Sequence, residues 1–243
     1  MTRLNPFDGC SENYCRFRPD YPVDLIDFVC TLSNHSLLID AGAGTGKASA
    51  PFVDRGVRVL SVEPSLAMIR QGLRSYPRLR YVCSTAEELP VASGAAGVVI
   101  SAQAFHWFDA PRALAEFARV LKRGGSVCLF WNTRGLEHAA PKLFDRLIHK
   151  WNPGHDPGYR RKDWGERIQE SGQFEAVNHR TFTQVTPMSI DDWIGLSRSI
   201  SYVQSMGARK LPGFERELRE GLAGLQSIDC PYRTELWSAT SRS

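Results

Sequence analysis

The sequence predicts a doubly wound α/β fold, in which a mostly parallel sheet carries helices on both faces. Two observations support this prediction. Short apolar runs alternate with helical patterns between Leu37 and Asn132, and the first run ends in a glycine-rich turn. Such repetition of strand and helix builds a parallel sheet, because parallel neighbours need a crossover connection. In sheets of this kind, ligands bind beyond the carboxyl ends of the strands.

Each element of this region has its own signal. Apolar runs predict strands near residues 37–41, 57–62, 79–83, 98–102 and 127–131. Helices are expected to begin near Gly46, Pro64 and Pro111. The third helix is the most clearly marked. Asp109 or Ala110 can cap it, proline suits its first turn, and Gly124-Gly125 can end it.

The glycine-rich turn, LLIDAGAGTG over Leu37–Gly46, is the strongest functional signal. Glycine accepts backbone angles that a β-carbon forbids, and it lets a ligand lie directly on the main chain. A helix starting near Gly46 would add free N–H groups and the positive end of its dipole. Glu63 ends the next apolar run, about 20 residues further on, where an acid can bind both hydroxyls of a ribose. The pattern predicts a site for a nucleoside-containing cofactor.

The spacing of the glycines favours one class of cofactor. A dinucleotide fingerprint is G-x-G-x-x-G, and Lys47 occupies the place of its third glycine. Asp40, just before the turn, suits a cofactor with a positive group better than one with two phosphates. An NAD(P)-dependent oxidoreductase, which would also need a Y-x-x-x-K pair that this chain lacks, is the less favoured alternative.

Length and composition limit the function classes further. A chain of 243 residues fits one α/β domain with additions, and 42% hydrophobic with 23% charged residues is ordinary for a globular protein. A net charge of +4 is too small to indicate nucleic-acid binding by itself. The six cysteines form no C-x-x-C pair, and no metal site is expected. No run reaches membrane length and the start lacks an apolar signal core, so we expect a cytoplasmic protein without a membrane partner.

Several segments match one family pattern in order and spacing. They are the lead-in Tyr14–Pro22, the glycine turn, Val62–Ser65, Thr85–Pro90, Ala102–Asp109, Arg119–Gly125, Phe130–Thr133 and Pro231–Leu236. With them the chain resembles class I S-adenosylmethionine-dependent methyltransferases. The resemblance is closer to the small-molecule branch that includes ubiquinone/menaquinone-type and trans-aconitate-type enzymes.

This resemblance implies a Rossmann-like, seven-stranded sheet that is mostly parallel with an antiparallel last strand, plus a helical cap. Residues 1–243 would then form one methyltransferase domain. Its parts would be a lid (1–30), a cofactor-binding core (31–135), a C-terminal core (136–186 and 231–243) and the cap insertion (187–230). The residues themselves predict helices at 136–151 and 164–170, strands at 174–185 and 232–240, and a helical segment at 189–226.

The resemblance also implies a cofactor, S-adenosyl-L-methionine, and the residues that hold it. These are Tyr14, Arg18, Asp40, Gly42, Ala43, Gly44, Glu63, Pro64, Thr85, Ala86, Glu87 and Ala102. Arg18 can bind the methionine carboxylate bidentately. The alternative is that the lead-in Tyr14–Pro22 only stabilises its own conformation. The family usually has Asp where this chain has Thr85, and an acid where it has Gly97. These departures leave open a member of the fold that binds the cofactor without transferring a methyl group.

His106 is the candidate catalytic base, because it follows the fourth strand and imidazole titrates near neutral pH. It could instead pack against adenine or bond to the backbone. Trp107, Trp131 and Tyr202 are candidate substrate-binding residues, with core packing as the alternative. The acceptor is expected to be a small organic molecule, methylated on oxygen or carbon rather than nitrogen and selected by the cap. Nucleic acid is not an expected partner.

Overall fold

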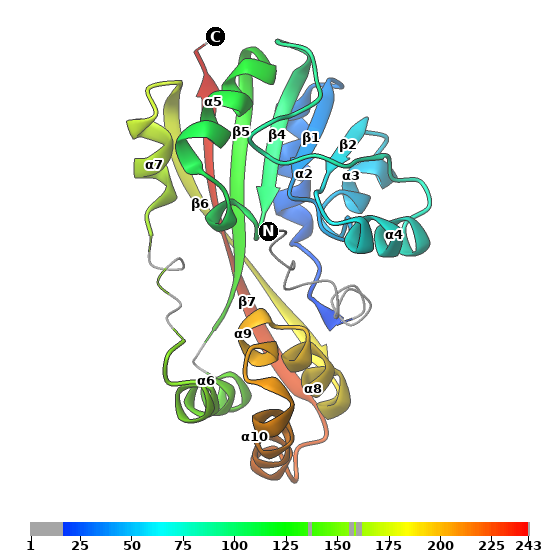
Figure 1. The fold of residues 1–243 in the computed structure, drawn as a ribbon, viewed down its shortest axis with the longest axis vertical. Coiled ribbons are helices and arrows are strands. Elements are labelled where there is room, and N and C mark those ends of the chain that lie inside the picture. The colour runs from blue at the N-terminus through cyan, green and yellow to red at the C-terminus, as the bar shows by residue number, and fades with distance from the viewer. Residues whose placement is uncertain (1–16, 136–137, 156–157, 159–161, 243) are drawn as a thin grey trace. The chain divides into compact units, whose positions relative to one another are not determined.

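The computed structural model describes residues 17–135, 138–155, 158 and 162–242. Within them, seven strands form one sheet in the order β3-β2-β1-β4-β5-β7-β6 (Figure 1). The strands are β1 (Leu37–Ala41), β2 (Val59–Val62), β3 (Tyr81–Val82), β4 (Ala96–Ala102), β5 (Leu121–Arg134), β6 (Phe174–Met188) and β7 (Ile228–Ser241). The helices are α2 (Val23–Ser33), α3 (Ala50–Asp54), α4 (Leu66–Ser75), η1 (Phe105–Trp107), α5 (Ala110–Val120), α6 (Ala139–Trp151), α7 (Trp164–Glu170), α8 (Ile190–Arg198), α9 (Ser201–Gln204) and α10 (Gly207–Gly221).

The described residues divide into two compact units. The core unit consists of residues 20–132, 162–182 and 234–242. The cap unit consists of residues 17–19, 133–135, 138–155, 158 and 183–233. The division between the two units falls inside strands β5, β6 and β7.

The direction of the strands confirms the predicted sheet. β1 pairs with β2 and β4, β2 with β3, and β4 with β5, all in parallel. β7 runs the other way beside β5. The N–H of Gly135 donates to the carbonyl of Pro231, and the hydroxyl of Thr133 donates to that of Arg233. The fold is therefore mostly parallel with an antiparallel last strand.

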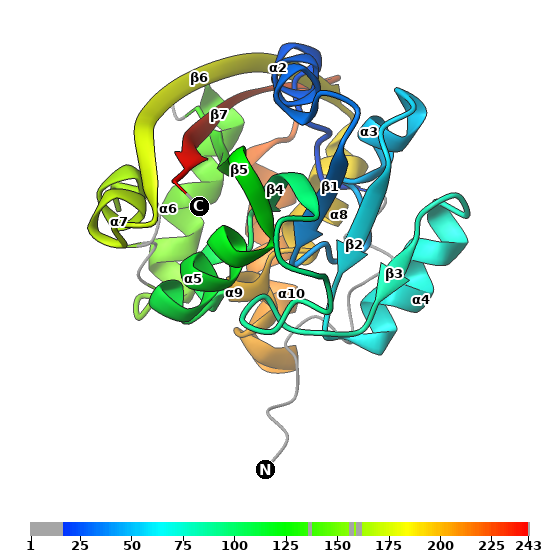
Figure 2. The same cartoon turned by 90° about the horizontal axis from the view of Figure 1, so that it is seen from above.

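Helices cover both faces of the sheet in the core unit (Figure 2). α2 and α3 cover one face, where Leu25 and Phe52 pack with Leu38, Val98 and Phe130. α4 and α5 cover the other face. β4 is buried along its whole length except its last residue, which explains its continuous apolar run. Burial of each valine and isoleucine side chain of β4 contributes about 1.5–3 kcal/mol.

The helix expected near Gly46 begins later than predicted. α3 starts at Ala50 and has 5 residues. Gly46 has a φ of +79°, which lies in the left-handed region and cannot continue a right-handed helix, so the chain first makes a turn. The N–H of Ala50 nevertheless donates to the carbonyl of Gly46 at 2.9 Å, so one helical turn follows the glycines directly, before α3.

The end of α5 also differs from the prediction. α5 is capped by Asp109, as expected, but it ends at Val120, before Gly124-Gly125. The two glycines lie within β5, next to a shift in its register with β4 between Ala96 and Val98. A Cβ on Gly125 would lie 3.0 Å from the carbonyl oxygen of Gly97, so the two strands approach too closely there for side chains.

The cap unit has its own apolar core. α6, α8 and α10 bury side chains that include Phe144, Trp193, Phe214 and Leu218. The helical segment expected over 189–226 is present as α8, α9 and α10. No helix in the described ranges is both long enough and apolar enough to cross a membrane.

Candidate active site

The glycine turn follows β1 in the core unit, and its two central glycines differ in their surroundings. Gly42 and Gly44 both have positive φ, +74° and +57°. A Cβ on Gly42 would lie 2.7 Å from the Cβ of Ala104, so packing alone requires this glycine. A Cβ on Gly44 would meet nothing nearer than Met68, at 3.9 Å. Gly44 is thus the point where a ligand can approach the main chain.

Glu63 is fixed against this turn. Its Oε2 accepts a hydrogen bond of 2.9 Å from the N–H of Gly44, and its Oε1 accepts one of 2.9 Å from the N–H of Ser65. The side chain is buried at 6% exposure. An ionised carboxylate has about four acceptor positions, so it can serve these amides and ribose hydroxyls together. The two segments that the sequence places about 20 residues apart therefore meet in one site.

Asp40 lies beneath the turn and is fully buried. Its Oδ2 accepts a hydrogen bond of 2.6 Å from Ser49, whose hydroxyl is also 2.8 Å from that of Ser61. Its Oδ1 has no partner among the described residues. Burial raises the pKa of Asp40 to about 7, which the Ser49 hydrogen bond partly offsets and the charge of Glu63 reinforces. A buried carboxyl oxygen without a donor suits a cationic ligand group.

Tyr81 and Lys47 also position the turn, and sequence reasoning gave neither of them a role there. The Tyr81 hydroxyl, from β3, donates to the carbonyl of Gly44 at 3.3 Å. A Cβ on Gly46 would lie 2.5 Å from that hydroxyl, so Gly46 serves packing rather than ligand approach. Lys47 is 12% exposed and forms an ion pair of 2.8 Å with Asp20. Tyr81 makes its contact across 37 positions of sequence, which no local pattern reveals.

The loop after β3 carries Thr85, Ala86 and Glu87. Thr85 is exposed and Ala86 is buried at 3% exposure. The carboxylate of Glu87 accepts a hydrogen bond of 2.9 Å from the N–H of Asp109. Glu87 therefore ties the loop to the start of α5, in addition to its predicted role at the cofactor.

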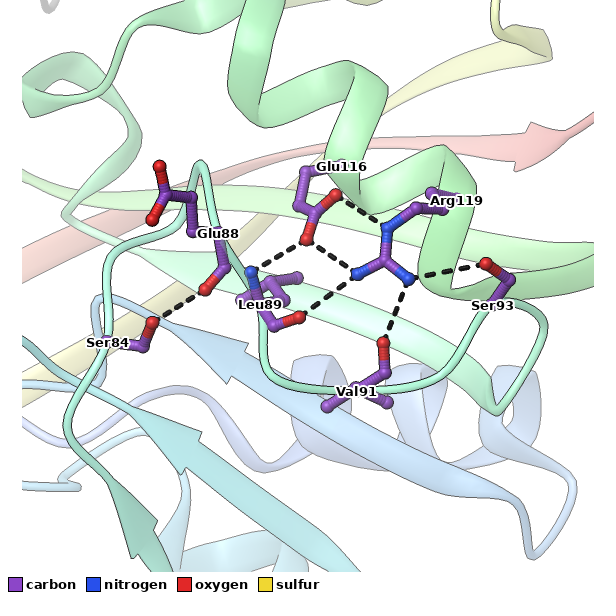
Figure 3. Close-up of polar contacts among 7 residues, drawn as sticks. All are labelled: Ser84, Glu88, Leu89, Val91, Ser93, Glu116 and Arg119. Carbon is purple, nitrogen blue, oxygen red and sulfur yellow. Dashed lines mark hydrogen bonds and ion pairs between the residues drawn. The ribbon is translucent and has the colours of Figure 1, made fainter.

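An ion pair on α5 holds the rest of this loop (Figure 3). Glu116 accepts a hydrogen bond of 2.7 Å from the N–H of Leu89. Arg119 donates to the carbonyls of Leu89 at 3.0 Å and Val91 at 2.9 Å, and to the hydroxyl of Ser93 at 3.3 Å. Nη2 of Arg119 lies 2.6 Å from Oε1 of Glu116, and the hydrogen bond from Arg119 lowers the pKa of Glu116. We call Glu116 and Arg119 the loop clamp.

β4 ends at Ala102, which is half-buried, and the chain then turns sharply. Gln103 has a φ of +58°, an unusual conformation for a residue other than glycine. Its side-chain amide donates to the carbonyl of Asn132 at 3.3 Å, and the Asn132 side chain accepts a hydrogen bond of 2.5 Å from Thr234. Backbone strain of this kind is often found at functional sites, where surrounding contacts hold it in place.

His106 lies on η1, directly after this turn. The indole N–H of Trp131 donates to its Nδ1 at 3.4 Å, which places the proton of a neutral ring on Nε2. Trp131 is 4% exposed, and its ring stacks on that of Trp164 with 5.0 Å between the ring centroids. Trp107 is 57% exposed and its ring centroid lies 4.8 Å from that of His106. Of these two tryptophans, Trp107 is exposed to solvent and Trp131 is buried.

His106 also lines a cavity of about 460 Å³ in the core unit, next to α5 and α7. Phe108, Leu114 and Trp164 give it apolar walls, and Lys162 and Gln173 add polar groups. Its volume lies within the range of small-molecule sites. The cavity gives His106 a space in which it could meet a ligand.

Two further predicted residues, Arg18 and Tyr202, belong to the cap unit. Arg18 donates to the carbonyl of Ser199 at 3.5 Å. The hydroxyl of Tyr202 accepts a hydrogen bond of 3.0 Å from Arg134, and its ring stacks on His155 at 3.9 Å. Tyr14 lies outside the described residues.

Comparisons with known proteins agree with this geometry. Residues 39–129 match the family model described as a methyltransferase domain. An uncharacterised methyltransferase of Mycobacterium bovis is 41% identical over 128 residues, which are 53% of this chain and 52% of that protein. A protein named as a methyltransferase in Dictyostelium discoideum is 29% identical over 209 residues, 80% of this chain and 76% of its own length. The chain thus spans about half the length of its mycobacterial relative.

The fold matches solved structures of the same class. A structure named as a type II methyltransferase from Anaeromyxobacter dehalogenans superposes with a TM-score of 0.72 at 26% identity, and the match covers 92% of this chain and 98% of that one. The fold, the glycine turn and the match over residues 39–129 all indicate a methyltransferase domain. The chain is thus similar to methyltransferases, over residues 39–129 by the family model and over most of its length by fold.

Proposed function

We propose that the chain transfers the methyl group of S-adenosylmethionine to a small organic acceptor, on oxygen or carbon rather than nitrogen. The observation that carries the proposal is the position of Glu63. Its buried carboxylate is held by the amides of Gly44 and Ser65, at the carboxyl end of β2. That is where the ribose of a nucleoside cofactor would need an acid.

The other residues of the turn fit the same cofactor. Gly44 leaves room for a ligand on the main chain. Asp40 offers a buried carboxyl oxygen without a donor among the described residues, which suits the positive charge of the methionine part. Thr85 and Ala86 lie on a loop held by the loop clamp, where we assign them to the adenine. Gly42, Ala43, Pro64, Glu87 and Ala102 complete the set of proposed cofactor residues, with Arg18 as a proposed contact of the methionine carboxylate.

When bound, S-adenosylmethionine would supply a methyl group on a positively charged sulfur. A nucleophilic acceptor atom would bond to the methyl carbon as the carbon–sulfur bond breaks, and the sulfur would leave as a neutral thioether. The protein residues mainly orient the two reactants, an effect worth about 7–11 kcal/mol in well-aligned systems. His106 is the residue that we place against the acceptor. With Trp131 donating to Nδ1, its neutral ring presents an Nε2 proton and orients the acceptor as a hydrogen-bond donor. To act as a base at Nδ1 it would have to give up the bond to Trp131.

Two alternatives remain distinguishable. An NAD(P)-dependent oxidoreductase is disfavoured because Lys47 stands at the third glycine position, mostly buried and paired with Asp20. A member of the fold that binds the cofactor without transferring its methyl group is compatible with Thr85 in place of an aspartate. The glycine at 97 has a steric reason of its own, because a Cβ there would lie 2.5 Å from the Cβ of Ser36.

The direct test is transfer of labelled methyl from S-adenosylmethionine to a panel of small acceptors, including phenols, enols and carboxylic acids. We expect a labelled product from wild-type protein and from the control Glu88→Ala, whose carboxylate is 78% exposed. We expect a loss of at least tenfold in Glu63→Ala. Binding of the cofactor with no labelled product from any acceptor would support the non-methylating alternative. A product that does not depend on Glu63 would contradict the assigned site.

A further inference from the structure

The cap unit contains a group of buried hydrogen-bond donors. Arg134 lies at the end of β5 and Tyr232 near the start of β7. The pairing of Thr133 with Arg233 and of Gly135 with Pro231 makes Arg134 and Tyr232 direct neighbours across the two strands. Side chains at such neighbouring positions lie on the same face of a sheet and interact.

Several polar atoms of this group have no acceptor. Arg134 donates through Nη2 to the hydroxyl of Tyr202, but its buried Nη1 has no partner among the described residues. The Tyr232 hydroxyl, on a side chain 5% exposed, interacts with the Cys230 thiol and has no oxygen or nitrogen partner among the described residues. The indole N–H of the fully buried Trp193 is likewise unpaired there. Leaving such donors unsatisfied costs about 1–3 kcal/mol each, more for a charged group.

The surroundings of Arg134 are aromatic rather than acidic. Its Cζ lies 4.2 Å from the ring centroid of Phe144 and 5.6 Å from that of Trp193. No carboxylate forms an ion pair with it within the described residues. Burial raises the pKa of Tyr232 in spite of the nearby positive charge of Arg134, so its hydroxyl keeps its proton and can donate. Among the described residues, the group therefore offers positive charge without a carboxylate to match it, and Nη1 of Arg134 and the indole N–H of Trp193 without an acceptor.

We propose that Arg134 and Tyr232, together with Trp193, bind an oxyanion group of the methyl acceptor, either a carboxylate or a phosphate. The proposal rests on the proposed function for the identity of the ligand as the acceptor. An oxyanion supplies the missing acceptor atoms, and a guanidinium binds it with strong, charge-assisted hydrogen bonds. A neutral analogue would leave the positive charge of Arg134 unmatched, which gives the cap unit a means of selecting acidic acceptors.

The test uses the full chain with citrate and inorganic phosphate as probes and the neutral succinamide as control, followed by calorimetry. The variants are Arg134→Met and Tyr232→Phe, and the matched control is Arg216→Met, an exposed arginine of the same unit. We expect at least one oxyanion to bind wild-type protein, at least tenfold weaker binding in Arg134→Met and several-fold weaker binding in Tyr232→Phe. Binding by Arg216→Met should be unchanged. Citrate alone would identify a carboxylate ligand, and phosphate alone a phosphate.

Titration with S-adenosylmethionine in parallel separates this inference from the proposed function. Cofactor binding without oxyanion binding, or with oxyanion binding that both variants retain, would overturn the inference and leave the proposed function intact. Oxyanion binding that depends on Arg134, without cofactor binding, would uphold the subsite and remove its assignment to a methyl acceptor. Tyr232→Phe keeps the test decisive if Arg134→Met does not fold, because it deletes a single hydroxyl.

Discussion

Asp40 is a residue through which we propose that the fold and the cofactor are linked. It is an acid at the end of a buried strand, held by Ser49 on one oxygen and without a described protein donor on the other. Such a group is costly to keep ionised in the folded protein, and a positive ligand removes part of that cost. Its titration is therefore a property that an experiment can follow.

We predict that Asp40 makes the protein less stable as the pH rises. Its pKa is about 7 in the folded state against an ordinary value of 3.8, so the folded state holds more protons between these values. The free energy of unfolding should fall from about pH 4 to about pH 7, by at most about 4 kcal/mol from this group. Urea unfolding of wild type and Asp40→Asn at several pH values measures the difference. An equal fall in the variant would show that Asp40 is not its source.

The two glycines Gly44 and Gly46 form a matched pair for substitution. Gly44→Ala should cost about 1–2 kcal/mol of stability for its positive φ, and it should weaken binding of S-adenosylmethionine by blocking the main chain. Gly46→Ala should cost more stability, because its Cβ would lie 2.1 Å from the Leu79 side chain. Thermal unfolding and cofactor titration of both variants check this. A greater loss of stability in Gly44→Ala would reverse the assignment.

His106 can be tested by two replacements. His106→Gln retains a donor near the position of Nε2, whereas His106→Ala removes it. If His106 orients the acceptor, His106→Ala should raise KM by about tenfold and His106→Gln should restore part of it, since one hydrogen bond is worth about 0.5–1.5 kcal/mol. Steady-state kinetics with an accepted substrate measure this. Unchanged kinetics and pH dependence in His106→Ala would remove the residue from the mechanism.

At the scale of elements, the loop clamp connects α5 to the loop that carries the proposed adenine contacts. Neither Glu116 nor Arg119 is a proposed ligand of the cofactor. Glu116 holds the backbone of Leu89, and Arg119 holds the backbone of Leu89 and Val91 and the side chain of Ser93 (Figure 3). The loop has little regular secondary structure. These side-chain hydrogen bonds therefore fix its backbone in place of the backbone hydrogen bonds of a strand or helix.

Loosening the clamp should weaken cofactor binding from a distance. Arg119→Ala removes three hydrogen bonds to the loop, and we expect a several-fold higher Kd for S-adenosylmethionine together with faster hydrogen exchange at Leu89. Arg112→Ala is the control, since its guanidinium lies on the same helix, is 61% exposed and forms a long ion pair of 3.4 Å. Equal effects of the two substitutions would argue against the clamp.

The sequence predicted elements well where their signals are local. β1 has the predicted bounds, and α7 does too, because an apolar run and an N-cap are short-range features. The start of α3 was predicted wrongly because a left-handed Gly46 is equally consistent with a turn and a helix start. The end of α5 was predicted wrongly because Gly124-Gly125 serves a close approach to Gly97 on another strand.

The same distinction applies to the site. Glu63 and the glycine turn could be predicted because strand ends in a parallel sheet meet at one edge. The hydrogen bonds of Tyr81 to Gly44 and of Arg119 to Leu89 could not, since they join residues far apart in sequence. Nor could the pairing of Trp131 with His106, which defines the tautomer of the candidate base.

At the scale of the whole molecule, the proposed roles fall into separate units. The core unit contains the residues that we assign to the cofactor, apart from those in the lead-in, and the cap unit contains the proposed oxyanion subsite. Each unit has its own apolar core, so substitutions in one should leave the fold of the other intact. This separation allows cofactor binding and oxyanion binding to be measured independently.

The measurement that tests the central claim most directly is calorimetric titration of the purified protein with S-adenosylmethionine, with NADH in parallel. We expect binding of S-adenosylmethionine in the micromolar range, at least tenfold weaker binding by Glu63→Ala, and no binding of NADH. Unchanged affinity in Glu63→Ala would contradict the assigned site. Binding of NADH alone, or of neither compound, would contradict the methyltransferase function itself.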